Sequence, residues 1–222
     1  MALNLLIFLG SVRTSGPPFP ARLGERVALY SAQQLTAAGH KVTVIDPLDY
    51  PLGEQFKPHF AYSADKAPPA LQQLSERIKN ADGYVMVSPE YNHSMSPALA
   101  HLLNHFGSSL FSYKPCAIVT YSAGQWGGVR AAVNMRSFLS ELGCLPVSAM
   151  IHVPHAQLIL NANGAYLEGV NEEQWQSYFA RTFSQLTWWA NATKEYARRS
   201  DGQSKPSAFT SHPAQRNAPS QD

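Results

Sequence analysis

An almost unbroken apolar segment near the N-terminus, Leu3–Leu9, constrains the fold more than any other feature of this chain. A strand with one solvent-facing side alternates apolar and polar residues, whereas this segment is apolar at nearly every position. It ends at Gly10, as expected where a strand gives way to a turn. We therefore predict a central strand of a parallel sheet, buried on both faces.

A helix and a second strand are predicted directly after this segment. Apolar residues at helical spacing run from Val27 to Ala38 and end at Gly39, and Lys41–Asp46 has the pattern of a strand. Strand, helix and strand form a βαβ unit, and its right-handed crossover makes the two strands parallel.

Further apolar segments alternate with helical patterns along the chain. Strands are predicted at Tyr84–Val87, at Lys114–Tyr121 and, as a fifth strand, from Leu145 to Val153. Strands that alternate with helices predict a doubly wound α/β fold. We expect a flavodoxin-like three-layer α/β/α sandwich whose five-stranded parallel sheet has the order 2-1-3-4-5.

Length and composition agree with one cytoplasmic domain. The 222 residues suit a single core, which we expect to span residues 1–199, and residues 200–222 are polar and predicted to be disordered. The net charge of +2 disfavours nucleic acid and anionic membranes as partners. No basic segment precedes the short apolar N-terminus, so a signal peptide is not expected. Two distant cysteines, Cys116 and Cys144, exclude a disulfide scaffold and favour a reducing compartment.

The turn after the first strand has the chemistry of a phosphate site. Ser11 offers a hydroxyl, and Arg13 offers a guanidinium near the start of the next helix, where the helix dipole favours an anion. Arg22 is a second candidate, beyond a proline-rich insertion at Gly16–Pro20. The alternative is that both arginines are solvated surface charges. Neither GxGxxG nor GxxxxGK[ST] occurs, so a dinucleotide fingerprint and a P-loop are disfavoured.

Two further loops follow the third and fourth strands. The first is Ser88–Pro97, stiffened at both ends by proline. Tyr91 offers a flat face for a planar ligand, and Asn92, His93 and Ser94 offer hydrogen bonds to its edge. The second is Ser122–Gly128, whose glycines let backbone amides approach a ligand edge closely. The alternatives are an ordinary polar crossover loop and a tight turn beside an exposed Trp126.

His101 and His105 lie one helical turn apart in the segment after Pro97. They could in principle bind a metal, but no third ligand accompanies them, so a solvated or capping role is favoured.

The three loops follow strands one, three and four, which places them together at the carboxyl edge of a sheet with this order. One loop suits a phosphate and two suit an aromatic ring system. This combination fits flavin mononucleotide (FMN) better than other common ligands.

The same three segments resemble the NAD(P)H-dependent FMN reductase family over roughly residues 3–155. The matching motifs are Gly10-Ser11-x-Arg13, Pro89-Glu90-Tyr91-Asn92-x-Ser94 and the glycine loop Ser122-Ala123-Gly124 with Gly127-Gly128. The resemblance implies that Ser11, Arg13 and Arg22 hold the FMN phosphate. It implies contacts to the ribityl chain and ring from Pro89, Glu90, Tyr91, Asn92 and Ser94, and from Ser122, Gly124 and Gln125.

The implied activity is hydride transfer from NADPH or NADH, through FMN, to a small electron acceptor such as free flavin, a quinone, an azo compound or a metal oxyanion. The protein would need no catalytic side chain and no metal for this transfer. Where relatives carry a Lys-Asn…Asp pattern after PEYN, this chain has Ala100, His101 and Asn104. A homodimer is therefore favoured, with a tetramer possible.

Two other functions stay open. A flavodoxin-like electron carrier would bind FMN without being an enzyme, but such carriers are strongly acidic and this chain is not. An interaction protein that kept the fold and lost the cofactor is favoured only by the proline insertion after Arg13.

Overall fold

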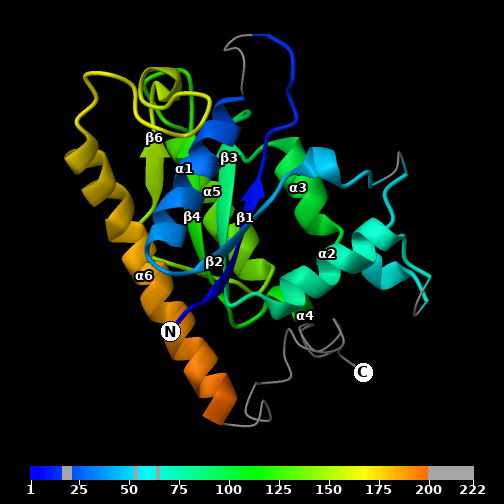
Figure 1. Ribbon diagram of the computed structural model, residues 1–222. Helices are drawn as coiled ribbons and strands as arrows, with labels where there is room; N and C mark the ends of the chain where they lie inside the picture. Colours follow the sequence, from blue (N-terminus) through cyan, green and yellow to red (C-terminus); the bar gives the residue numbers. More distant parts are fainter. Residues whose placement is uncertain (17–21, 53–54, 64–65, 200–222) are drawn as a thin grey trace, which may run out of the picture.

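The apolar segments form the centre of a parallel sheet with helices on both faces (Figure 1). The computed structural model describes residues 1–16, 22–52, 55–63 and 66–199. The strands are β1 (Asn4–Leu9), β2 (Lys41–Ile45), β3 (Gly83–Pro89), β4 (Pro115–Tyr121), β5 (Leu145–Pro146) and β6 (Ile151–Val153). The helices are α1 (Leu23–Ala37), α2 (Pro69–Asn80), α3 (Pro97–Asn104), α4 (Ser108–Phe111), α5 (Val129–Glu141) and α6 (Glu172–Arg199), with short 3-10 turns η1 (Pro47–Asp49), η2 (His59–Ala61) and η3 (Ala156–Leu158).

The strand order is β2-β1-β3-β4-β5, as the sequence predicts. β1 lies between β2 and β3 and pairs in parallel with both, with Leu5 opposite Val42 on one side and Gly83 on the other. The chain reverses its direction of progress along the sheet at β1 and β3, and such a reversal leaves a crevice at the carboxyl ends of the strands.

The predicted fifth strand is wrong in one respect, because it is two short strands. Both β5 and β6 pair in parallel with β4, at opposite ends of it. Pro146 has no amide hydrogen to donate to a further ladder bond. The guanidinium of Arg136 donates hydrogen bonds to the carbonyl oxygens of Val147 and Pro146, at 2.8 and 3.4 Å. A side chain therefore satisfies these backbone acceptors at the edge of the sheet.

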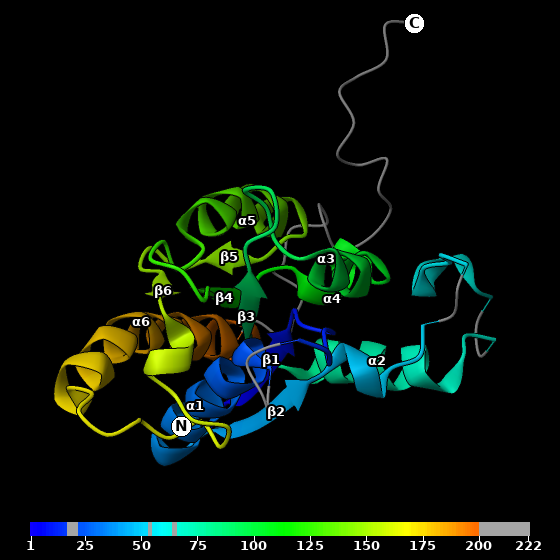
Figure 2. The ribbon, with the colours of Figure 1, turned by 90° about the horizontal axis from the view of Figure 1, so that it is seen from above.

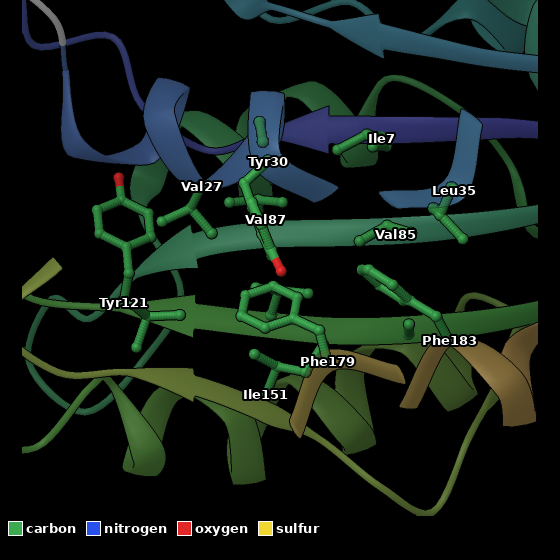
Figure 3. Packing of buried hydrophobic residues seen from close by; sticks show 14 of the residues in the cluster. Ile7, Val27, Tyr30, Leu35, Val85, Val87, Tyr121, Ile151, Phe179 and Phe183 are labelled. Carbon is green, nitrogen blue, oxygen red and sulfur yellow. The ribbon is translucent and has the colours of Figure 1, made fainter. Parts of the chain in front are cut away.

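Alternate residues of the buried strands supply two separate cores. Leu5, Ile7 and Leu9 face α1 and α6, whereas Leu6 and Phe8 face the side of α2 to α5. Figure 2 shows the two helical layers seen from above, and Figure 3 shows Phe179 and Phe183 of α6 packed over Val85 and Val87. Burial on both faces explains why the strands read as continuous apolar segments.

The helix ends follow local signals in the sequence. Ser96 caps α3 by accepting a hydrogen bond from the amide of Leu99 at 3.1 Å, and Pro97 occupies the first turn. Asn171, directly before α6, accepts from the amide of Gln174 at 3.1 Å in the first turn of that helix. The predicted tail, 200–222, and residues 17–20 of the proline insertion lie outside the described residues.

The described part of the chain lacks two features and places two candidate residues in structural roles. It contains no helix long and apolar enough to cross a membrane and no group of three potential metal ligands among His, Cys, Asp and Glu. His105 is buried, and its Nδ1 bonds to the carbonyl oxygen of His101 at 2.8 Å, so it is a capping residue and not a solvated one. Cys116 is a buried free thiol, and burial raises its pKa well above the usual value, which fits packing and not nucleophilic chemistry.

Candidate functional site

The carboxyl ends of β1, β3 and β4 open into a cavity of about 640 Å³. The three loops that the sequence singles out contribute to its walls, and so do the first turns of α1 and α3. Its lining residues from these loops and turns include Gly10, Ser11, Val12, Arg13, Thr14, Ser15, Arg22, Leu23, Pro89, Glu90, Tyr91, Ser96, Pro97, Tyr121, Ser122 and Ala123. A volume of this size is ordinary for a site that binds a cofactor.

Where the chain leaves β1 it passes very close to β3 and to the start of α3. The amide of Gly10 donates to the carbonyl of Val87 at 2.7 Å, and a Cβ at Gly10 would lie 2.8 Å from Oγ of Ser96. Glycine is therefore required where β1 passes the start of α3. Among the described residues, the amides of Val12 and Thr14 donate to no other backbone carbonyl. This turn thus carries N–H groups that a ligand could use.

The two candidate arginines have different environments. Arg22 is nearly buried, and its guanidinium is held by the carboxylate of Asp46 and by the carbonyl oxygen of Ser11. Burial alone would lower the pKa of Arg22, but the hydrogen bond and the charge of Asp46 outweigh it and raise that pKa. Arg13 is exposed and lines the cavity. Arg22 therefore braces the turn, and Arg13 is the cation at the cavity surface.

The loop after β3 is a tight two-residue turn. Tyr91 and Ser94 exchange two backbone hydrogen bonds, each 2.9 Å long. Asn92 and His93 between them have φ values of 50° and 62°, the left-handed conformation that such turns require. The side chain of Asn134 on α5 donates to the carbonyl of His93 and ties the turn to α5. Tyr91 is 48% exposed and lines the cavity.

Glu90 caps the N-terminus of α5, although it lies far from that helix in the sequence. Its Oε2 accepts from the amides of Arg130 at 3.1 Å and Ala131 at 3.3 Å, and Oε1 lies 3.6 Å from the Arg130 guanidinium. Gly128, at the cap position, has no side chain to do this. The carboxylate therefore fixes the β3 loop against α5, in addition to lining the cavity.

The glycine loop after β4 is shaped by Ser122. Its Oγ donates to the carbonyl of Gly124 at 2.7 Å and accepts from the amide of Gly127 at 3.0 Å. Gly127 and Gly128 have φ values of 59° and 78°, and a Cβ on Gly128 would lie 2.9 Å from Cβ of Thr120. A Cβ on Gly124, in contrast, would meet nothing within 4 Å. The loop is thus rigid at its second half and sterically open at Gly124.

Seven of the sequence-predicted residues come together in the cavity wall, and four do not. Those that line it are Ser11, Arg13, Arg22, Pro89, Glu90, Tyr91 and Ser122, and those that do not are Asn92, Ser94, Gly124 and Gln125. Trp126, beyond the cavity, is 59% exposed and has the Arg130 guanidinium over its ring at 5.3 Å.

Sequence reasoning missed Tyr121, the last residue of β4. Its side chain is buried, lines the cavity and interacts with Ser11. The available signal was its position at a strand end directly before a candidate loop. It also missed the close approach of Gly10 to Ser96, two residues that line the cavity.

Comparison with known proteins gives the chain a family. The model of the family described as NADPH-dependent FMN reductase matches residues 3–158. A 2-hydroxy-1,4-benzoquinone reductase from a Burkholderia species is 27% identical over 169 residues, which cover 74% of this chain and 85% of that protein. An NADPH azoreductase from a Bacillus species is 33% identical over 90 residues, which cover 40% of this chain and 51% of that protein.

An NAD(P)H-dependent FMN reductase from Pseudomonas aeruginosa is 33% identical over 105 residues, which cover 46% of this chain and 57% of the relative. The match to it and to the azoreductase thus spans little more than half of each relative. The solved structure of FerB, a flavoenzyme NAD(P)H:(acceptor) oxidoreductase from Paracoccus denitrificans, superposes with a TM-score of 0.64 at 18% identity, over 84% of this chain and 98% of FerB. That likeness concerns the fold. The family match covers well over half of the sequence, and the chain belongs to the NADPH-dependent FMN reductase family.

Proposed function

We propose that this protein is an FMN-dependent oxidoreductase that passes hydride from NADPH or NADH to a small acceptor such as free flavin, a quinone, an azo compound or a metal oxyanion. The observation that carries the proposal is that three loops, at the ends of β1, β3 and β4, line one shared cavity. Membership of the family and relatives named as FMN, quinone and azo reductases support it. When bound, FMN would supply the ring system that accepts and donates hydride.

The donors present fit a phosphate monoester at the β1–α1 turn. Val12 and Thr14 contribute amides without a backbone acceptor among the described residues, and Ser11 contributes a hydroxyl. The first turn of α1 begins nearby at Leu23 and favours negative charge. Arg13 would contact the phosphate directly, whereas Arg22 would act mainly through the turn that it holds with Asp46.

The other two loops fit a planar ring. The half-exposed ring of Tyr91 offers an aromatic face at the cavity wall. Ser122 and Ala123 bring the start of the glycine loop into the cavity wall, and Gly124 next to them is sterically open. Backbone donors there could stabilise negative charge on a reduced ring without any movement, since the Ser122 hydrogen bonds already fix the loop.

The carboxylates at the cavity are already engaged. Glu90 is committed to the start of α5, and Glu25 lies 3.7 Å from the Arg22 guanidinium. The chain therefore orients and encloses its ligands, which is what hydride transfer through a flavin asks of a protein. We therefore propose that no side chain acts as a catalytic acid or base.

We include in the proposal a cytoplasmic homodimer. The free, buried thiols Cys116 and Cys144 suit a reducing compartment. Phe56, between η1 and η2, and Phe60, within η2, are 50% and 67% exposed, and exposed rings of this kind favour a subunit contact. Light scattering after size-exclusion chromatography tests this part of the proposal, and a monomeric mass would contradict it.

An absorbance experiment tests the activity. The purified protein is mixed with FMN, desalted and then treated with NADPH under anaerobic conditions. We expect the flavin bands to be retained and then to bleach, and a quinone added afterwards to restore them. Retained flavin that neither NADPH nor NADH bleaches would favour the electron carrier, and a protein that retains no flavin would favour the interaction protein.

A further inference from the structure

Tyr121 is a buried polar side chain that connects two loops of the cavity. It ends β4, immediately before the glycine loop, and only 5% of it is exposed. Figure 3 shows its ring leaving the strand and extending toward the first turn of α1. Its hydroxyl interacts with Ser11, in the turn after β1, and both residues line the cavity. β3 lies between β1 and β4, so this side chain bridges across the end of the middle strand.

The first turn of α1 is shaped around the same phenol. A Cβ at Gly24 would clash with the Tyr121 hydroxyl, would lie 2.8 Å from its Cζ and would also lie 3.0 Å from the side chain of Leu9. Gly24 is helical and needs no unusual φ, so conformation does not require glycine there. Glycine inside a helix costs about 0.5–1 kcal/mol relative to alanine. The space taken by the Tyr121 ring is the physical reason for this glycine.

The phenol lies in a cationic environment but stays neutral. Burial raises the pKa of Tyr121 well above its usual value, and this effect outweighs the interaction with Ser11 and the charges of Arg22 and Arg13, which lower it. A neutral phenol keeps its proton and offers both a donor and an acceptor. It can therefore hold the Ser11 hydroxyl in one orientation without cancelling the positive charge of the turn.

We propose that Tyr121 is a positioning residue that, by holding Ser11 and filling the space against Gly24, fixes the β1–α1 turn for a phosphate monoester and so makes the cavity select FMN over riboflavin. This inference rests on the proposed function. Tyr121 acts through Ser11 and the turn, not on the ring system of the ligand. The phosphate is the group that distinguishes the two flavins, so their affinity ratio reports on the turn alone.

The test measures the dissociation constants of FMN and riboflavin by flavin fluorescence, for the wild type and for Tyr121→Phe. Loss of a hydroxyl that orients a ligand-binding group should weaken FMN binding about tenfold and leave riboflavin binding within about twofold. The matched control is Tyr84→Phe, which removes a buried hydroxyl bonded to the carbonyls of Ile78 and Leu110, away from the cavity. It should change neither affinity.

Two further variants separate positioning from packing. Ser11→Ala should weaken FMN binding, and the double variant with Tyr121→Phe should be no weaker than Ser11→Ala alone, because both changes remove one linked contact. Gly24→Ala, which displaces the phenol while keeping its hydroxyl, should lower the same FMN-to-riboflavin ratio. If Tyr121→Phe folds poorly, Gly24→Ala replaces it in the test.

The outcomes distinguish failure of the inference about Tyr121 from failure of the proposed function. A wild type that binds FMN tightly while Tyr121→Phe keeps the same ratio would overturn the inference and leave the proposed function standing. Equal weakening of both flavins would also overturn it, since that result assigns Tyr121 to packing. A wild type that binds neither flavin would overturn the proposed function itself.

Discussion

Removal of the Glu90 carboxylate should destabilise the protein by about 2 kcal/mol, although Glu90 lies in a loop that the sequence assigns to ligand binding. The carboxylate accepts from the amides of Arg130 and Ala131 at the start of α5, and the cap residue Gly128 offers no side-chain acceptor. Loss of a capping acceptor costs about 1 kcal/mol, with a range of about 0.5–2. Loss of a negative charge at a helix N-terminus adds about 0.3–1 kcal/mol.

The ion pair with Arg130 contributes little to this sum. Its N–O distance is 3.6 Å and the arginine side chain is 43% exposed, so solvent screens the attraction. The amide hydrogen bonds therefore dominate. Glu90→Gln, which keeps an acceptor oxygen but loses the charge, should cost about 1 kcal/mol, or roughly half as much as Glu90→Ala.

Urea denaturation followed by circular dichroism measures both free energies of unfolding. In thermal melts a loss of about 2 kcal/mol corresponds to a fall in Tm of about 4–8 °C for a domain of this size. Glu76→Ala, on the exposed face of α2, is the control and should stay within about 0.5 kcal/mol of the wild type. If Glu90→Ala also stays within that range, the proposed role of Glu90 as the cap of α5 is wrong.

Three further predictions follow from other contacts. Lys114→Met should lower the free energy of unfolding, measured by urea denaturation, by about 2–3 kcal/mol. The reason is that the ammonium lies 2.8–3.1 Å from three main-chain carbonyl oxygens at the ends of α2 and α4. A loss of stability below about 0.5 kcal/mol would refute this role. Burial lowers the pKa of His105, so the unfolded state binds more protons below about pH 6.5, and the free energy of unfolding should fall as the pH drops from about 7 to about 5. This fall should be shallower in His105→Phe, and an unchanged pH slope would contradict it. Arg13→Gln should weaken FMN binding about tenfold in fluorescence titration and spare riboflavin, whereas equal affinities for FMN in variant and wild type would exclude Arg13 from the phosphate site.

Local pattern was enough to predict most of the fold. Continuous apolar segments indicate strands buried on both faces, and the polar or glycine residue that ends each one marks the carboxyl edge of the sheet. The order 2-1-3-4-5 then places three loops together. The split between β5 and β6 was not predictable in this way, because it depends on Pro146 at an edge and on Arg136, which reaches that edge from α5.

The composition of the site was predictable, but the task of each side chain was not. Glu90 serves a helix that begins 39 positions later, and Arg22 is held by a carboxylate at the end of β2. Tyr121 has the pattern of a strand residue, and only its direction at the strand end brings it to Ser11. Such long-range pairings depend on the assembled sheet, and no local spacing encodes them.

The claim that FMN occupies the cavity at the ends of β1, β3 and β4 is tested most directly by hydrogen–deuterium exchange of the whole protein with and without FMN. We predict slower exchange in peptides that cover residues 10–15, 89–95 and 122–125, with no change around the groove between α1 and α6 that includes Leu35 and Trp188. Protection confined to that groove, or spread evenly over the chain, would contradict the account.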